Sequence, residues 1–131
     1  MKRLVLLGLV VCLVAAGGCR RPKSDGTYDI GPDKLKSADM PPAKLIVIDF
    51  ESKDNVPITA VLVKSEDATA ALKAVDDGKP IEQVLGNAKQ IAVQTGTRGT
   101  LTSPETDSKT KYSVLLHSKK PTTVTVRSNG K

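Results

Sequence analysis

Aromatic residues are scarce in this chain of 131 residues, which has no tryptophan, one phenylalanine and two tyrosines. Proteins that bind single strands of nucleic acid stack the bases on aromatic rings, so the sequence disfavours a nucleic-acid partner. The same scarcity argues against binding of stacked sugar rings. A hydrophobic core must therefore be built from valine, isoleucine, leucine and alanine.

Histidine is almost absent as well, since His117 is the only one. One histidine excludes a metal site with two histidine ligands, and the chain has neither a G-x-S-x-G nor an S-x-x-K nucleophile motif. We therefore expect no catalytic residue, no metal and no cofactor, and no enzymatic activity. Alternation with Leu116 places His117 on the opposite strand face, where we expect an exposed or rim histidine.

Only one long hydrophobic run is present, and it lies at the start of the chain. Leu4 to Val14 follows the basic residues Lys2 and Arg3 and carries no charge. As a helix these residues would span roughly 17 Å at about 1.5 Å per residue, short of a hydrocarbon core of about 30 Å. The run is typical of a secretory signal, and it predicts an exported protein.

Small residues and a cysteine follow this run. Ala16-Gly17-Gly18-Cys19 resembles the lipobox of bacterial lipoproteins, in which a leucine, two small residues and a cysteine stand in this order. The resemblance implies that Cys19 becomes a diacylglycerol thioether and the first mature residue, so that residues 1–18 form the signal peptide. The sequence departs from the pattern at Ala16, where the family prefers leucine. The alternative is an ordinary secretory signal with Cys19 as a free thiol.

The use of cysteine favours the lipoprotein interpretation. Cys12 lies in the signal peptide, so the mature chain would have Cys19 alone and no internal disulfide. A free thiol is a liability in an oxidising compartment, and acylation, for example with palmitate, removes it. Lipoproteins with aspartate after the cysteine tend to stay in the inner membrane. Arg20 stands there instead, so we expect attachment to the outer membrane where a bacterium has two.

The sequence predicts three parts along the chain: a signal peptide (1–18), a flexible tether (19–43) and a small β-sandwich domain (44–131). Four prolines, two glycines and no sustained apolar period between residues 20 and 44 predict the tether. Beyond it, apolar and β-branched runs separated by turn residues predict strands. The predicted strands are 45–50, 57–64, 90–95, 98–103, 111–118 and 122–128.

Two helical patterns interrupt these strands. Residues 65–78 place apolar side chains at helical spacing, and residues 79–87 repeat this after Pro80. The sequence thus predicts a mainly β protein, a small antiparallel β-sandwich of about six or seven strands with a two-helix insertion near 66–85. Strands 45–50 and 57–64 form either a hairpin or parts of two sheets.

Two stretches of the domain resemble known sandwiches. Residues 100–128 resemble the last strands of immunoglobulin and fibronectin type III domains, with Tyr112 at the place of their corner tyrosine. Residues 55–63 resemble transthyretin-like envelope modules. The tryptophan and cysteine pair of the first family and the glycine after the proline of the second are missing. Both resemblances imply only a sandwich.

Positive charge gathers toward the end of the chain. The whole chain has a net charge of +6, from 20 basic and 14 acidic residues, and without Lys2 and Arg3 the balance is 18 to 14, or +4. Pairing of strands 111–118 and 122–128 as a hairpin would place much of this charge on one outer face. We name five residues as a possible contact for an anionic surface: Lys109, Lys111, Lys119, Lys120 and Arg127. The alternative is a surface that only aids solubility.

The sequence therefore predicts a lipid-anchored cell-envelope protein of structural or interaction type, not an enzyme. Its expected partners are the membrane, through the lipid, and an anionic envelope polymer or another envelope protein. The alternative is a module that binds a small ligand or a divalent ion. Asp49 and Glu51, which alternate with apolar residues on one strand, would serve that role.

Overall fold

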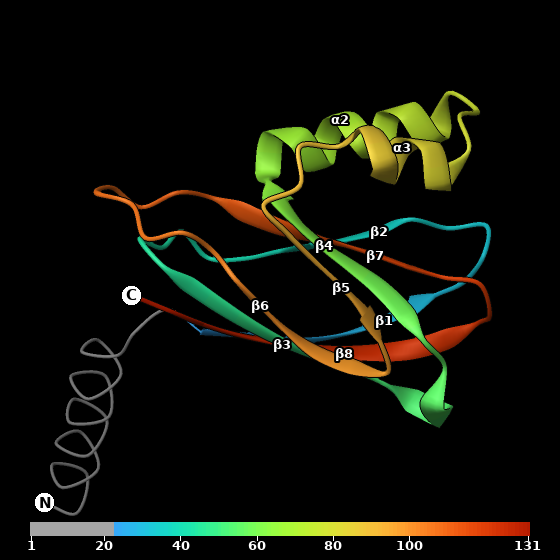
Figure 1. The fold of residues 1–131 in the computed structure, drawn as a ribbon, viewed down its shortest axis with the longest axis horizontal. Coiled ribbons are helices and arrows are strands. Elements are labelled where there is room, and N and C mark those ends of the chain that lie inside the picture. The colour runs from blue at the N-terminus through green and yellow to red at the C-terminus, as the bar shows by residue number, and fades with distance from the viewer. Residues whose placement is uncertain (1–22) are drawn as a thin grey trace, which may run out of the picture.

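Two four-stranded antiparallel sheets face each other in the computed structural model, which describes residues 23–131 (Figure 1). The first sheet consists, in spatial order, of β1 (Lys23–Ile30), β8 (Thr122–Gly130), β3 (Ile46–Ser52) and β6 (Arg98–Thr102). The second consists of β2 (Lys36–Asp39), β7 (Tyr112–Ser118), β4 (Ile58–Lys64) and β5 (Ala92–Gly96). The predicted β-sandwich is confirmed, with eight strands in the described part.

Alternation along the strands builds the core between the sheets. In β3, Ile46, Ile48 and Phe50 are buried while Asp49 and Glu51 are exposed. A strand points successive side chains to opposite faces, so this pattern puts one face on the core and the other in water. The Phe50 ring lies against Gly99 of β6, where a Cβ atom would come within 2.8 Å of the ring.

Two helices cover the second sheet. Helix α2 (Ser65–Asp76) and helix α3 (Ile81–Asn87) lie on the side of this sheet that faces away from the first sheet (Figure 1). They form a second apolar cluster with the outward side chains of β4 and β7, among them Val61, Val63 and Leu115. Both faces of β7 are therefore covered, and every residue of this strand is buried. The predicted two-helix insertion is confirmed.

The predicted flexible tether is wrong for the residues that the structure describes. Residues 23–30 form β1, which pairs along its whole length with β8, and residues 36–39 form β2, which pairs with β7. Ile30, Leu35, Ala38 and Met40 are buried. An edge strand needs few inward side chains, so a polar segment rich in proline and glycine still supplies enough of them. The sandwich thus begins at Lys23, not near residue 44.

The predicted hairpin of strands 111–118 and 122–128 is also wrong. β7 pairs with β2 and β4, whereas β8 pairs with β1 and β3. The three residues between them carry the chain from one sheet to the other, a distance of about 10 Å in a sandwich. β3 and β4 are likewise in different sheets, as the second of the two alternatives for them predicted.

The predicted signal peptide and Cys19 lie outside the described residues. Among the helices between residues 23 and 131, none has the length and apolar character needed to cross a bilayer.

Candidate functional site

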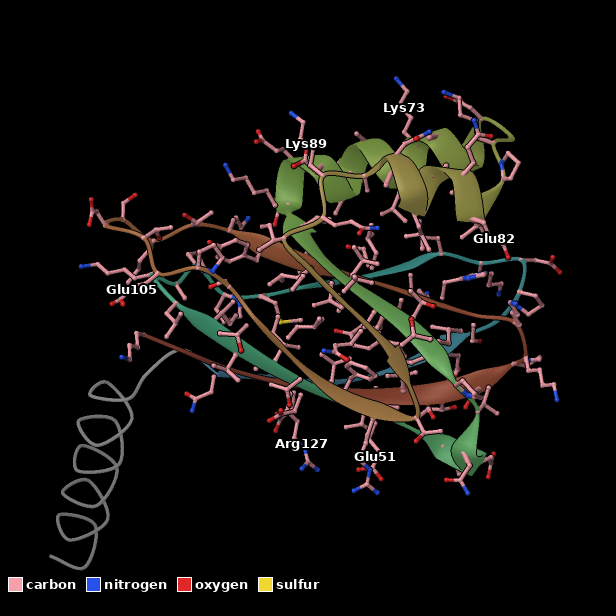
Figure 2. The ribbon with its side chains drawn as sticks, in the orientation of Figure 1. Glu51, Lys73, Glu82, Lys89, Glu105 and Arg127 are labelled. Atoms are coloured by element: carbon pink, nitrogen blue, oxygen red, sulfur yellow. The ribbon has the colours of Figure 1, made fainter. Side chains whose placement is uncertain are left out.

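The outer face of the first sheet is polar and uncovered. Asp49 of β3 is aligned with Arg127 of β8, which is aligned in turn with Asp25 of β1. Figure 2 shows Glu51 and Arg127 projecting from this face, away from the second sheet. Opposite charges on aligned strands stabilise a sheet by about 0.2–1 kcal/mol for each pair. Asp49 and Glu51 thus share one exposed face, as their spacing predicts.

A shallow hollow of about 490 Å³ lies over this face. Asp49, Glu51, Thr125 and Arg127 line part of it. The hydroxyl of Thr100 donates a hydrogen bond of 2.7 Å to Asp49, so one carboxylate oxygen already has a partner within the sheet. In the described part of the chain, no three side chains of histidine, cysteine, aspartate or glutamate come together as a metal site would require.

A larger hollow, of about 730 Å³, lies on the outer face of the second sheet beside α3. Its floor is a row of three residues on neighbouring strands, because Thr59 of β4 is aligned with Thr95 of β5 on one side and with His117 of β7 on the other. The helices cover the adjacent part of the sheet and leave this row open. We call this cavity the α3 hollow.

His117 is buried in this floor, with 8 % of its surface exposed, so the predicted exposed or rim histidine is wrong. Its ring nitrogen Nε2 lies 3.2 Å from the carbonyl oxygen of Pro32, in the connection between β1 and β2. A backbone carbonyl can only accept, so the neutral ring donates its Nε2 hydrogen there. The strand face was predicted correctly, but the helices and the β1–β2 connection, which bury that face, were not foreseen.

The walls of the α3 hollow come from three segments. Glu82 and Leu85 of α3 form one wall, and Lys119 and Lys120 between β7 and β8 form another. Residues 54–57 complete the third wall, next to the short helix η1 (Lys53–Asn55). The rim therefore carries both signs of charge over a floor of hydroxyl groups and one imidazole.

The third wall has an unusual backbone. Asp54 and Asn55 both adopt left-handed conformations, with φ of 60° and 56°. Such conformations are uncommon outside glycine, although aspartate and asparagine tolerate them best. Two hydrogen bonds hold the segment: Ser52 Oγ donates to the Val56 carbonyl at 2.6 Å, and Thr122 Oγ1 donates to the Lys53 carbonyl at 2.8 Å.

The five basic residues that we expected on one surface are divided among three places. Lys109 and Lys111 precede β7 at one end of the sandwich, and Lys119 and Lys120 follow it at the other. Arg127 lies on the outer face of the first sheet. A single anionic-contact face is therefore wrong, because β7 and β8 belong to different sheets. Only Lys119 and Lys120 contribute to the α3 hollow.

Thr59, Thr95 and Glu82 were not foreseen as site residues. Their sequence context is that of ordinary strand and helix surface, and only the register of β4, β5 and β7 brings them together. The alternation of His117 with Leu116 was the one signal in the sequence that pointed to this face.

No protein-family model matches the chain, and no curated protein matches it in sequence. Two solved structures are similar in fold. The Yersinia pseudotuberculosis-derived mitogen has 9 % sequence identity and a TM-score of 0.54, over 85 % of this chain and 87 % of that protein. The Aeromonas hydrophila periplasmic inhibitor of g-type lysozyme has 7 % identity and a TM-score of 0.52, over 83 % of this chain and 86 % of the inhibitor. At these identities the similarity shows a shared small β-sandwich fold and nothing finer.

Proposed function

We propose that this protein is an exported, lipid-anchored component of the bacterial cell envelope that acts by binding a partner and not by catalysis. The α3 hollow is the contact site in this proposal. Cys19, outside the described residues, is the lipidated residue, and the outer membrane is the expected location where two membranes exist.

The floor of the α3 hollow is the observation that carries the binding role. A histidine that acts as a general base needs a free ring nitrogen directed at the substrate, and it is commonly oriented by a carboxylate. His117 instead has Nε2 next to the backbone carbonyl of Pro32. Together with the hydroxyl groups of Thr59 and Thr95, this fixed ring offers a polar surface that recognises a partner through hydrogen bonds.

The rim of the α3 hollow agrees with a polar partner. Lys119 and Lys120 attract a carboxylate or another anionic group, while Glu82 and Asp54 attract a cationic one. A rim of both signs favours a folded protein or a peptide over a uniformly charged polymer. The lysozyme inhibitor of similar fold is, by its name, a periplasmic protein that acts on another protein, which is the class of role proposed here.

Lipid attachment is tested by metabolic labelling with radioactive palmitate. We expect the wild-type protein to incorporate label and to sediment with membranes, and the variant Cys19→Ser to lose both properties. Cys12→Ser is the matched control, because Cys12 is the other cysteine of the chain and lies in the predicted signal peptide. Undiminished labelling of Cys19→Ser would contradict the proposal.

The binding role is tested by photocrosslinking in living cells. A photoreactive amino acid is placed at Thr95 in the α3 hollow or, as the control, at Thr100 on the outer face of the first sheet. Both are exposed threonines on strands at the edges of their sheets. A discrete adduct from position 95 and none from position 100 is expected. Equal patterns from both positions would rule out the α3 hollow as the contact site.

A further inference from the structure

The folded domain begins only four residues after Cys19. Three residues, Arg20 to Pro22, separate Cys19 from Lys23, the first residue of β1. Four fully extended residues reach at most about 14 Å, which is less than the long axis of a domain of this size. If the proposed lipid is attached at Cys19, the end of the sandwich at which β1 starts cannot move far from the membrane surface.

Backbone hydrogen bonds define that end of the sandwich. Lys23 is aligned with Asn129, near the end of β8. Lys131 exchanges two hydrogen bonds of 3.0 Å with the segment before β3, donating to Leu45 and accepting from Lys44. Figure 1 shows the C-terminus and the connection between β6 and β7 at this same end. We call residues 43–45, 103–111 and 129–131 the anchor end.

The connection between β6 and β7 is fixed at the anchor end as well. Thr106 donates its backbone N–H to the Lys44 carbonyl at 2.8 Å, and Thr110 and Ala43 exchange backbone hydrogen bonds of 2.9 Å and 3.1 Å. These contacts place Lys109 and Lys111 beside Lys44, so that the lysines form part of one surface.

The charge of the anchor end is only moderately positive. Four lysines are exposed there, against two exposed carboxylates, Glu105 and Asp107. The lysines are Lys44, Lys109, Lys111 and Lys131. Each basic residue near an anionic surface contributes about 1 kcal/mol of attraction, and Arg20 and Arg21 in the connection add to it. Charge thus agrees with contact to anionic head groups, while the short connection determines the orientation.

The α3 hollow lies at the opposite end. β7 runs from Tyr112, next to Lys111 of the anchor end, to Ser118, which lines the α3 hollow. Its seven residues span about 20 Å at about 3.4 Å per residue. Residues 54–57 and the connection between β7 and β8 lie at this far end too.

From these observations, and on the basis of the proposed lipid anchor, we infer that the anchor end rests on the anionic head groups of the membrane and that the α3 hollow faces away from it. The open hollow then stands about 20 Å above the surface, where another envelope protein reaches it without touching lipid. The fold thus sets the direction in which the protein presents its binding site.

Lys109→Cys and Lys119→Cys provide a matched pair for a test. Both are exposed lysines, and they lie just before and just after β7. Because a lipidated Cys19 has no free thiol, a fluorophore attaches to the introduced cysteine alone. The mature lipoprotein is inserted into vesicles of phosphatidylethanolamine and phosphatidylglycerol that carry a nitroxide quencher on the head groups.

We expect the label at position 109 to be quenched about threefold more strongly than the label at position 119, because the two sites differ by about 20 Å in height. Equal quenching, or stronger quenching at position 119, would overturn the orientation. Flotation of each labelled protein with the vesicles is measured first. Protein that does not float would overturn the lipid anchor and the orientation with it, whereas floating protein with equal quenching overturns the orientation alone.

A lengthened connection tests the physical cause. Insertion of about 15 glycine and serine residues between Pro22 and Lys23 gives the domain a flexible tether. Flotation should persist, and the difference in quenching between positions 109 and 119 should fall toward equality. An unchanged difference would overturn the role of the short connection.

Discussion

Substitution Ile30→Ala tests whether β1 belongs to the folded domain. Ile30 is the last residue of β1, is 4 % exposed, and packs in the core cluster that also contains Val124 and Val126 of β8. Truncation of a buried isoleucine to alanine costs about 2–5 kcal/mol. We expect the lower part of that range, about 2–3 kcal/mol, because β1 is an edge strand around which a cavity can partly close.

A loss of about 2–3 kcal/mol should lower the melting temperature by about 10 °C in a domain of this length. The assay is thermal unfolding of the lipid-free chain from residue 20, followed by circular dichroism. Val93→Ala is the control, because Val93 is 47 % exposed on edge strand β5 and its truncation should change stability by less than about 0.5 kcal/mol. If Ile30→Ala melts within about 2 °C of the wild type, residues 23–30 are a tether and the assignment of β1 is wrong.

Three further substitutions test the packing of the sandwich by the same measurement. Ser103→Ala should cost about 1–3 kcal/mol, because Ser103 Oγ accepts a buried hydrogen bond of 2.9 Å from the backbone N–H of Ile46; an unchanged melting temperature would contradict this. Gly99→Ala should cost about 1–3 kcal/mol, since the new methyl group would lie 2.8 Å from the buried Phe50 ring, and a stabilised variant would show that the ring moves freely. Gly78→Ala should cost about 1 kcal/mol because Gly78 follows α2 with φ of 96°, where a side chain is strained. No loss of stability there would mean that the turn relaxes.

The sequence carries the central strands and both helices clearly. All six predicted strands coincide with strands of the structure to within about two residues, a usual uncertainty for element ends. These strands are β-branched and apolar because they are buried on one or both faces, and the helices have a regular apolar stripe. Burial of this kind leaves a periodic pattern that can be recognised without a structure.

The edge strand β1 leaves a weaker pattern. Asp25, Thr27 and Asp29 point outward, while Tyr28 and Ile30 point into the sandwich, so residues 25–30 do alternate. Only two large inward side chains are present, and the glycine and proline residues around them are typical of a linker. The alternation was the available signal, and the composition concealed it.

The candidate site was less predictable than the fold, because it depends on which sheet each strand joins. The connection between β7 and β8 has a length that suits a hairpin equally well, and local sequence does not distinguish a hairpin from a crossing between sheets. Sheet membership therefore decided that Lys119 and Lys120 border the α3 hollow while Arg127 lies on the opposite side of the molecule.

The intact mass of the mature protein, extracted from membranes with detergent, tests the central claim of a lipid-anchored envelope protein most directly. We expect a chain that begins at Cys19 and carries the added mass of a diacylglycerol thioether, with or without a further acyl group on the new amine. A chain of unmodified mass, or one cut at another position and released into the soluble fraction, would contradict the lipid anchor and the orientation inferred from it.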